Sequence, residues 1–373
     1  MPQKPVSDRE LERTIRTFAE LRQFGPTARK LMLSESSVKN RLVRAIPPFG
    51  EKYGVGFDAL PQSMLRRHGV VAEGRTAQKA REFEVAAVPD EDIDVEELVQ
   101  IRKRQFSKKR AHEEARKLIP VKVKIPGPIG ILHFGDPHVD DDGTDIGLLE
   151  HHKALCMATD GLFAANVGDI TNNWVGRLAK LYDSQSTSAK QAWKLAEWLL
   201  KDLKLLYLIG GNHDGWSGAG DPLKWIAGQT DSLYQSSECR LALNFPNGRQ
   251  VRVNARHDFA GHSQWNPAHG PMKAVLMGAR DHISVCGHKH KTGYGIVKDP
   301  NTEIACHAFQ IASYKIFDRY ARERGFRDQS LGPCVLTVIN IDLPDTHPDL
   351  VKPFWNADEG VDYLKHLRRK ARA

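Results

Sequence analysis

The stretch IGILHFGDPH, residues 129–138, joins a short apolar run to two polar side chains that can bind a metal. Four later stretches have the same plan, since each is a short apolar run that leads into Gly, Asp, Asn, Arg or His. Such runs are typical of buried strands, and open α/β sheets place their sites at the carboxyl ends of strands. We therefore predict five strands that deliver polar side chains. The runs are 129–134, 162–167, 205–209, 251–253 and 283–286, and the polar blocks are Gly135–His138, Gly168-Asp169, Gly211–Asp214, Arg256-His257 and Gly287–His290.

Seven polar side chains of these blocks are candidate metal ligands, because they supply carboxylate, amide and imidazole donors without any thiolate. This mixture suits manganese, iron or zinc rather than calcium, and it does not suit an iron–sulfur cluster. A carboxylate can bridge two cations, and cations roughly 3.5–4 Å apart are the usual means of displacing a phosphoester. Seven ligands shared by two ions leave positions open for water and substrate, which is typical of a catalytic site. The candidates are Asp136, His138, Asp169, Asn212, His257, His288 and His290.

The order of the five blocks resembles that of the calcineurin-like metallophosphoesterases, and the chain is similar to the DNA-repair exonuclease branch of that family. The resemblance implies an α/β fold, a two-sheet sandwich flanked by helices. It also implies two divalent metal ions, manganese first with iron or zinc as alternatives, and a metal-bound hydroxide as the nucleophile. The first metal would be held by Asp136, His138, Asp169 and His290, and the second by Asp169, Asn212, His257 and His288.

His213 lies inside the fourth block, and the resemblance gives it a role other than metal binding. It would act as a general acid toward the leaving oxygen or stabilise the phosphoryl group. In much of the family a carboxylate three residues after the bridging aspartate orients this histidine, whereas here that position is Asn172. An asparagine can accept a hydrogen bond from imidazole but cannot stabilise imidazolium by charge. We therefore expect His213 to titrate at a lower pH, or to depend on Asp214 instead.

Other residues near the blocks have more than one possible role. His257 directly follows its strand and is our choice as a ligand of the second metal, but His262 and His269 are near enough in sequence to compete. His133 lies within a strand and is expected to be packed rather than catalytic. Arg177 is a candidate phosphate contact, and the alternative is that it is an ordinary surface arginine. The candidate substrate contacts are Arg177, Asn172 and His262.

Positive charge is concentrated outside the five blocks. The chain carries a net charge of +8, yet residues 1–46 alone carry +5 and residues 101–124 carry +8. Localised basic segments favour polyanionic partners, although a solvated helix face is the alternative for residues 102–110. The sequence contains no run of about 18 apolar residues, and its first residues are polar, so we expect neither a membrane span nor a secretion signal. Five cysteines without Cys-x-x-Cys spacing are expected to be reduced and mostly buried.

Residues 1–46 have the pattern of three short helices, which we predict at 11–22, 27–32 and 35–45. Pro26 suits the first turn of the second helix, and Ser34 is a good N-cap for the third. Val38 and Leu42 would face inward. This arrangement resembles a helix-turn-helix, whose second helix enters the major groove of DNA. The alternative is a small helical bundle that binds protein or merely packs. The candidate DNA contacts are Ser36, Ser37, Asn40, Arg41 and Arg44, of which Arg41 and Asn40 can read base edges.

The sequence thus predicts four parts. A small all-α helix-turn-helix domain, residues 1–46, precedes an irregular and basic linker region, residues 47–127, with a basic helix at 97–118. The metallophosphoesterase domain takes residues 128–345, in which residues 187–202 have the spacing of a helix that covers a sheet. Residues 346–373 form a basic C-terminal tail, and its end, residues 363–373, is expected to be a basic helix or a disordered end.

The predicted function is that of a dinuclear-metal-dependent phosphoesterase, most specifically a nuclease or phosphodiesterase that acts on DNA. A protein or small-molecule phosphatase is one alternative, although the Gly-Asp-x-x-Asp-Arg-Gly and Gly-Asn-His-Glu signatures of Ser/Thr phosphatases are absent. A DNA-binding regulator with an inactive hydrolase domain is another, but no ligand position is lost. The architecture suits a cytoplasmic phage or bacterial protein of DNA metabolism without a membrane partner, and it leaves the oligomeric state open.

Overall fold

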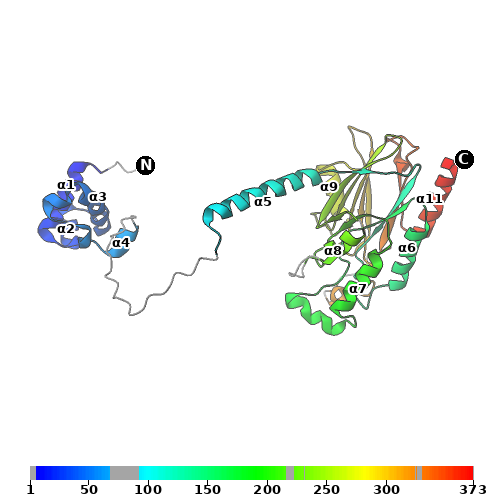
Figure 1. Ribbon diagram of the computed structural model, residues 1–373, viewed down its shortest axis with the longest axis horizontal. Helices are drawn as coiled ribbons and strands as arrows, with labels where there is room; N and C mark the ends of the chain where they lie inside the picture. The colour runs from blue at the N-terminus through cyan, green and yellow to red at the C-terminus, as the bar shows by residue number, and fades with distance from the viewer. Residues whose placement is uncertain are drawn as a thin grey trace. The chain divides into compact units, whose positions relative to one another are not determined.

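The structure is a computed structural model that describes residues 6–67, 92–215, 222–230, 232–323, 325 and 330–372. The chain divides into two compact units, Met1–Asp92 and Ile93–Ala373. Figure 1 shows the helices of the first unit in blue and the two sheets of the second unit. Within the described residues, no helix is long and apolar enough to cross a membrane.

The first unit contains the three helices that the sequence predicts. They are α1 (Asp8–Leu21), α2 (Phe24–Leu31) and α3 (Glu35–Tyr53), and η1 (Phe57–Ala59) and α4 (Gln62–Arg67) follow. Ser34 caps α3, since its hydroxyl accepts a hydrogen bond from the amide of Ser37 at 3.1 Å. Val38 and Leu42 are fully buried in a core that includes Ile15. The inward-facing positions of α3 are therefore confirmed.

Helix α3 runs beyond its predicted end at residue 45 and contains Pro47 and Pro48. The prediction of an irregular connector from residue 47 is wrong for this stretch. A proline inside a helix removes a backbone hydrogen bond. Here Ile46, and Val55 beyond the helix, are buried in the same core, and their burial offsets the missing donors. Gly54, with a φ of 59°, ends the helix in the left-handed conformation.

The second unit is a sandwich of two six-stranded sheets, which confirms the predicted α/β fold. The first sheet has the order β1-β6-β7-β8-β10-β9 and the second the order β12-β11-β2-β3-β4-β5. Ile131, Val253 and Ile283 belong to the apolar core between them. The strands are β1 (Ile119–Lys122), β2 (Ile129–Phe134), β3 (Leu162–Asn166), β4 (Leu205–Ile209), β5 (Tyr234–Gln235), β6 (Glu238–Asn244), β7 (Gln250–Arg256), β8 (Ile283–Cys286), β9 (Gly293–Lys298), β10 (Ala305–Gln310), β11 (Cys334–Ile339) and β12 (Val351–Phe354).

Helices cover the outer faces of the sandwich. Leu149, Leu199, Leu223 and Leu364 bring four helices onto the second sheet, and Val275 brings one onto the first. The helix predicted at 187–202 is confirmed as α7. All five cysteines are buried and free, as the sequence predicts. The helices are α5 (Val95–Arg116), α6 (Ile146–Ala158), η2 (Gly176–Ser184), α7 (Ala189–Leu200), α8 (Pro222–Gln229), α9 (His269–Met277), α10 (Arg319–Glu323), η3 (Pro348–Leu350) and α11 (Ala357–Arg372).

The five apolar runs that precede the polar blocks form β2, β3, β4, β7 and β8, as predicted. Strands β2, β3 and β4 are parallel neighbours in the second sheet, and β7 and β8 are parallel neighbours in the first. The carboxyl ends of parallel neighbours lie at the same edge of a sheet. Each sheet therefore presents its own group of polar blocks at one edge.

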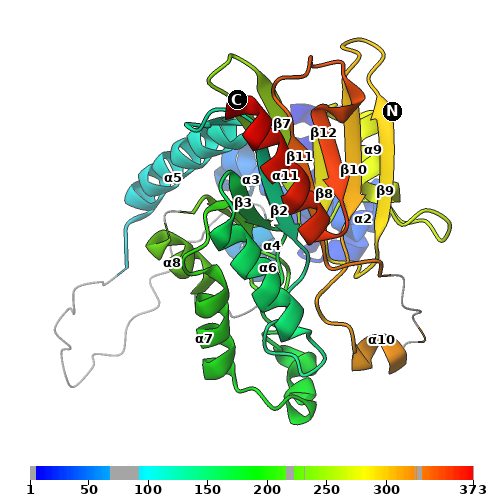
Figure 2. The same ribbon diagram turned by 90° about the vertical axis from the view of Figure 1, so that its right-hand side faces the viewer.

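The residues predicted to form a basic tail belong to the sandwich instead. Strand β12 pairs with β11, and α11 packs over β11 and β2 (Figure 2). Val361 and Leu364 are buried, and the Arg368 guanidinium donates to Asp160 at 2.8 Å. The boundary at residue 345 is wrong, because the apolar positions between the basic residues form a packed helix face. The boundary at 128 is too late by one strand, since β1 (Ile119–Lys122) precedes it and pairs with β6.

Candidate metal centre

The polar blocks of the two sheets meet at one edge of the sandwich. Among the described residues, three overlapping groups of acidic and histidine side chains have ligand atoms within 4.8 Å of one another and could hold a metal ion. The groups are Asp136 with His138 and His290, His138 with Asp169 and His213, and Asp169 with His257 and His288.

The first group is built by Asp136, His138 and His290. The Nε2 atom of His290 lies 3.2 Å from Asp136 Oδ2 and 3.3 Å from Nε2 of His138. Asp136 Oδ1 and His138 Nδ1 are buried and have no hydrogen-bond partner among the described residues. A buried carboxylate oxygen without a donor is costly. A cation among these atoms would satisfy it, so this donor set fits a metal.

The second group surrounds Nε2 of His257. This atom lies 2.9 Å from Asn212 Oδ1, 3.1 Å from His288 Nδ1 and 3.2 Å from Asp169 Oδ2. The Nδ1 atom of His257 is 2.9 Å from the carbonyl of Val167, and because a carbonyl only accepts, Nδ1 carries the hydrogen. Nε2 of the neutral ring is then an acceptor that faces other acceptors. A shared cation or proton would make these contacts attractive, so this donor set also fits a metal.

Asp169 belongs to both sides of the centre. Its Oδ2 atom lies 3.2 Å from His257 Nε2 and 4.0 Å from His138 Nε2. Burial opposes its ionisation, but the histidines around it, first His257, hold the pKa of Asp169 below its ordinary range. Burial also disfavours charge on His257, yet Asp169 raises the pKa of His257 to about 10. The carboxylate thus stays ionised, and a metal would replace the proton that the pair otherwise shares.

The ligand loops adopt backbone conformations that residues with side chains rarely take. His138, Asp169, His288 and His290 have φ values of 40°, 53°, 69° and 49°. Such left-handed conformations are uncommon outside glycine, and their strain is concentrated at functional sites. Gly211 allows close approach, because a Cβ atom there would overlap the carboxylate of Asp169. The backbone conformations of these loops therefore bring the candidate ligand side chains close together.

Asp214 ends the fourth block and binds backbone amides. Its carboxylate accepts hydrogen bonds from the amides of Asp169 at 2.8 Å, Ile170 at 3.1 Å and Gly211 at 2.8 Å. Burial, together with the charge of Asp169, raises the pKa of Asp214 to about 7. Asp214 therefore fixes the two turns that carry Asp169 and Asn212, a role that the sequence did not reveal.

His213 lies beside both ligand groups. Its Nδ1 atom donates to the carbonyl of Asn172 at 2.5 Å, and its amide donates to Asp169 Oδ1 at 2.9 Å. Its ring meets those of His138 and Trp174 edge-on. Because Nδ1 carries the hydrogen, Nε2 is the atom available to the centre, 3.9 Å from Asp169 Oδ2. The main chain of Asn172, rather than a carboxylate side chain, therefore fixes the ring's tautomer.

Asn172 itself is fully buried. Its amide nitrogen donates to Asp141 Oδ2 at 2.8 Å and to Gln185 Oε1 at 3.0 Å, and its backbone amide donates to Asp140 at 2.7 Å. Its side chain is therefore not placed to contact a substrate, contrary to expectation. An amide fits this position better than a carboxylate, because the surrounding oxygen atoms need a donor.

The remaining candidates lie in different places. His257, rather than His262 or His269, joins the second group, whereas His262 and His269 line a pocket on the loop after β7. Arg177 lies in η2, and its side chain is outside the described residues. His133 is buried with its Nδ1 atom 2.6 Å from the hydroxyl of Tyr207, so the prediction of a packed histidine is confirmed.

An acidic cluster beside the centre was not predicted. Asp140 and Asp141 follow the second ligand of the first block, and Lys315 Nζ lies 2.9 Å from Asp141 Oδ2 and over the ring of Trp174. The run Val-Asp-Asp-Asp at 139–142 was a signal for the acidic half of this cluster. Its cation comes from the segment after β10, which only the fold brings near.

The five candidate DNA contacts all lie on α3 of the first unit. Arg44 is exposed, whereas the Arg41 guanidinium is held 3.6 Å from a carboxylate oxygen of Glu10. DNA binding by these residues, and the helix-turn-helix itself, stay predictions.

No protein-family model matches the chain, and neither does any curated protein. Among solved structures, the chain is similar to the nuclease MPE of Pseudomonas putida, with 14% identity, 60% of this chain and 87% of that one covered, and a TM-score of 0.29. It is also similar to the calcineurin-like phosphoesterase YfkN from Bacillus subtilis, with 12% identity, 66% and 98% covered, and a TM-score of 0.33.

Proposed function

We propose that this chain is a metal-dependent phosphoesterase of the calcineurin-like type that uses two divalent cations. The observation that supports this most is that Asp169 lies between two ligand groups, each of which combines side chains from both sheets. A carboxylate shared in this way suits a pair of cations, which is the usual arrangement for displacement at phosphorus. The proposed ligands are Asp136, His138 and His290 on one side, and Asn212, His257 and His288 on the other.

Bound cations would supply an activated water and would neutralise charge on the phosphoryl oxygens. The chain's own residues hold and orient these participants. Asp136 and Asp169 contribute negative charge, and the carbonyl of Val167 fixes the ring of His257. In its imidazolium form His213 would give a proton from Nε2 to the leaving oxygen, while the carbonyl of Asn172 holds the hydrogen on Nδ1. For an oxygen and imidazole donor set we propose manganese, with iron and zinc as alternatives.

We further propose that the substrate is a phosphodiester of DNA. Helix α5 supports this choice, because it has no buried residue and carries lysine and arginine at six positions between 102 and 110. A polyanion is the natural partner of such a helix. The basic first unit, with Arg44 exposed on α3, would add a second contact.

The test is an assay of one metal-loaded preparation against four substrates: labelled single-stranded DNA, labelled duplex DNA, a chromogenic phosphodiester and a chromogenic phosphomonoester. We expect manganese-dependent hydrolysis of the diester and of DNA, and loss of both when a chelator is added. Hydrolysis of the monoester alone would contradict the proposal in favour of a phosphatase. A protein that binds metal and DNA but hydrolyses none of the four would be a regulator.

A further inference from the structure

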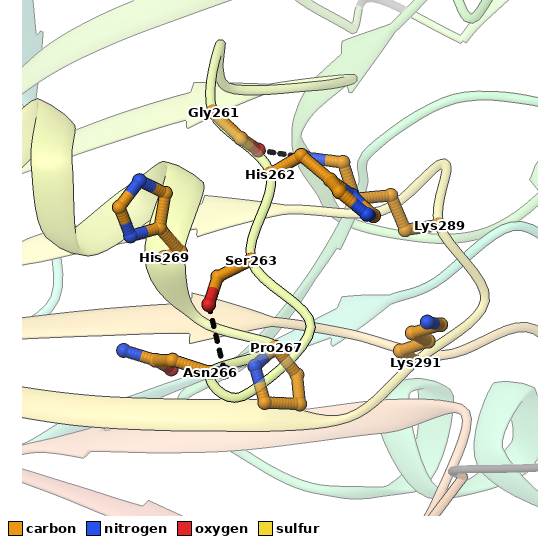
Figure 3. A pocket seen from close by; sticks show the side chains of 8 residues that line it. All are labelled: Gly261, His262, Ser263, Asn266, Pro267, His269, Lys289 and Lys291. Carbon is orange, nitrogen blue, oxygen red and sulfur yellow. Dashed lines mark hydrogen bonds between the residues drawn. The ribbon is translucent and has the colours of Figure 1, made fainter.

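A shallow pocket adjoins the proposed metal centre. It is lined by Lys289, which lies between the ligands His288 and His290, and by the loop that follows His257 (Figure 3). The pocket therefore begins one residue away from two ligands of the centre. Its lining residues are Gly261, His262, Ser263, Asn266, Pro267, His269, Lys289 and Lys291.

The loop is held in place by specific hydrogen bonds. Lys289 Nζ donates to the carbonyls of Phe259 at 3.3 Å and Gly261 at 2.9 Å. Ser263 Oγ accepts from the amides of Trp265 and Asn266, both at 3.2 Å, and the second of these bonds is drawn in Figure 3. A loop tied to the metal-ligand segment at one end and by its own serine at the other can present a fixed surface.

The charge of the pocket favours an anion. No carboxylate is among its lining residues. Lys289 is partly neutralised, because its ammonium group lies 2.9 Å from Asp258 Oδ1. Lys291 has no ion-pair partner among the residues that the structure describes, and it is only half-buried. The ammonium group of Lys291 is therefore available to a phosphate that lies beside the centre.

The same loop presents an aromatic surface. Trp265 is 92% exposed, and it directly precedes Asn266 of the pocket lining. A large indole in water stabilises no core of this chain, but it suits an unpaired base, since stacking of a base on an aromatic ring contributes roughly 1–3 kcal/mol. Cations beside an exposed aromatic ring are the usual combination in single-strand binding sites.

We propose that the pocket and Trp265 form a subsite for the nucleotide that flanks the scissile phosphate in single-stranded DNA. Lys291 contacts a phosphate of the strand, and Trp265 stacks on a base. This inference rests on the proposed function for its scissile phosphate, but the subsite makes its own prediction. A duplex keeps its bases stacked on one another, so Trp265 would favour a single strand over a duplex.

The test measures binding and turnover separately on the full chain. Binding of a fluorescent single-stranded oligonucleotide with a phosphorothioate backbone is followed by anisotropy, which does not require hydrolysis. We expect Trp265→Ala to weaken this binding about tenfold, as the loss of one stacked base implies. Lys291→Gln should weaken it and reduce the salt dependence by about one phosphate contact. Both variants should hydrolyse the small chromogenic diester at the wild-type rate, since it has no flanking nucleotide.

Two matched substitutions outside the pocket serve as controls. Trp225→Ala removes another exposed tryptophan, on α8, and Lys194→Gln removes an exposed lysine on α7. Neither should change binding. Binding within twofold of wild type in both Trp265→Ala and Lys291→Gln would overturn the subsite, and so would a wild-type chain that does not bind the oligonucleotide. A wild-type chain that does not hydrolyse the diester would instead overturn the proposed function. The binding measurements would still decide whether the subsite exists.

Discussion

His213 illustrates how one side chain can be fixed without a charged partner. The carbonyl of Asn172 holds its Nδ1 hydrogen, which leaves Nε2 for proton transfer beside Asp169. This bond supplies orientation but no negative charge. The ring is therefore positioned by the backbone of the loop after β3, and a substitution of the Asn172 side chain would act on His213 only indirectly.

His213→Ala should retain both metals and lose roughly 10²–10⁴-fold in the rate of diester hydrolysis, because a positioned general acid contributes about that much. Steady-state kinetics and elemental analysis on the same sample check both halves of this prediction. His366→Ala, at an exposed position on α11, is the control. Loss of one metal from His213→Ala would show that His213 is a ligand instead, as its place near His138 and Asp169 allows.

Asn172→Asp should destabilise the fold. The substitution would place a second carboxylate within hydrogen-bonding distance of Asp141, where an amide now donates at 2.8 Å. Like charges in a buried site repel, and the donor to Asp141 would be lost. We expect a loss on the order of 2 kcal/mol in the free energy of unfolding, measured by urea denaturation. Unchanged stability would contradict this prediction and would indicate that the Lys315 ammonium group neutralises the added carboxylate.

The candidate ligands could be proposed residue by residue because each one closely follows an apolar strand and differs chemically from its surroundings. The roles of Asp214 and Asn172 could not, since both depend on which backbone amides and oxygens the folded loops bring near. A buried asparagine and an exposed one look the same in a sequence. Local patterns therefore indicate which residues are candidate metal ligands, and only the fold shows which residues hold those side chains in place.

At the scale of elements, the strands were predicted well and two helix boundaries were not. Strands β2, β4 and β8 match their apolar runs closely, because a buried strand is marked by continuous apolar residues. Helix α3 was predicted to end before Pro47, and the residues of α11 were assigned to a tail outside the sandwich. In both cases burial outweighed a local signal, a proline in α3 and a run of basic residues in α11.

Two buried histidines of the first sheet should make stability depend on pH, namely His282, which directly precedes β8, and His307, which lies within β10. Burial lowers the pKa of His282 and of His307 to about 4, from an ordinary value of 6.5. The unfolded chain therefore takes up these protons near pH 6.5, but the folded chain does so only near pH 4. The contribution of the two neutral histidines to the free energy of unfolding should be complete above pH 6.5. It should be lost as the pH drops toward 4, by up to about 3 kcal/mol for each histidine.

His282→Gln should flatten this dependence, because the variant has one fewer buried group to protonate. Urea denaturation at pH 7 and at pH 4.5 measures the effect. His366→Gln, which changes an exposed histidine on α11, is the control and should follow the wild type. An equal pH dependence in His282→Gln and wild type would contradict the assignment of the acid sensitivity to this group.

At the scale of the molecule, the chain combines a small helical unit with a sandwich. The sequence predicted a boundary after residue 46, which would cut α3, because charge changes along a chain more visibly than packing does. The compact units instead meet at residues 92 and 93. Removal of residues 1–92 therefore leaves the second unit whole, with α5, both sheets and all seven proposed ligands.

Removal of residues 1–92 should leave hydrolysis of the small chromogenic diester intact. It should weaken duplex binding and flatten its salt dependence. A chain that makes fewer phosphate contacts releases fewer counterions when it binds. Anisotropy with labelled duplex DNA over a range of salt concentrations measures this. Duplex binding unaffected by the truncation would move the DNA contact to α5 and would make the first unit a packing or protein-binding element.

The central claim is that two sheets assemble one centre for two cations around Asp169. Elemental analysis of the chain after equilibration with manganese and removal of free metal tests it most directly. We expect about two ions per chain in the wild type and in Asp362→Asn, an exposed control on α11, and less than one in Asp169→Asn, because the bridge neutralises charge between the cations. Two ions retained by Asp169→Asn, or only one bound by the wild type, would contradict the account.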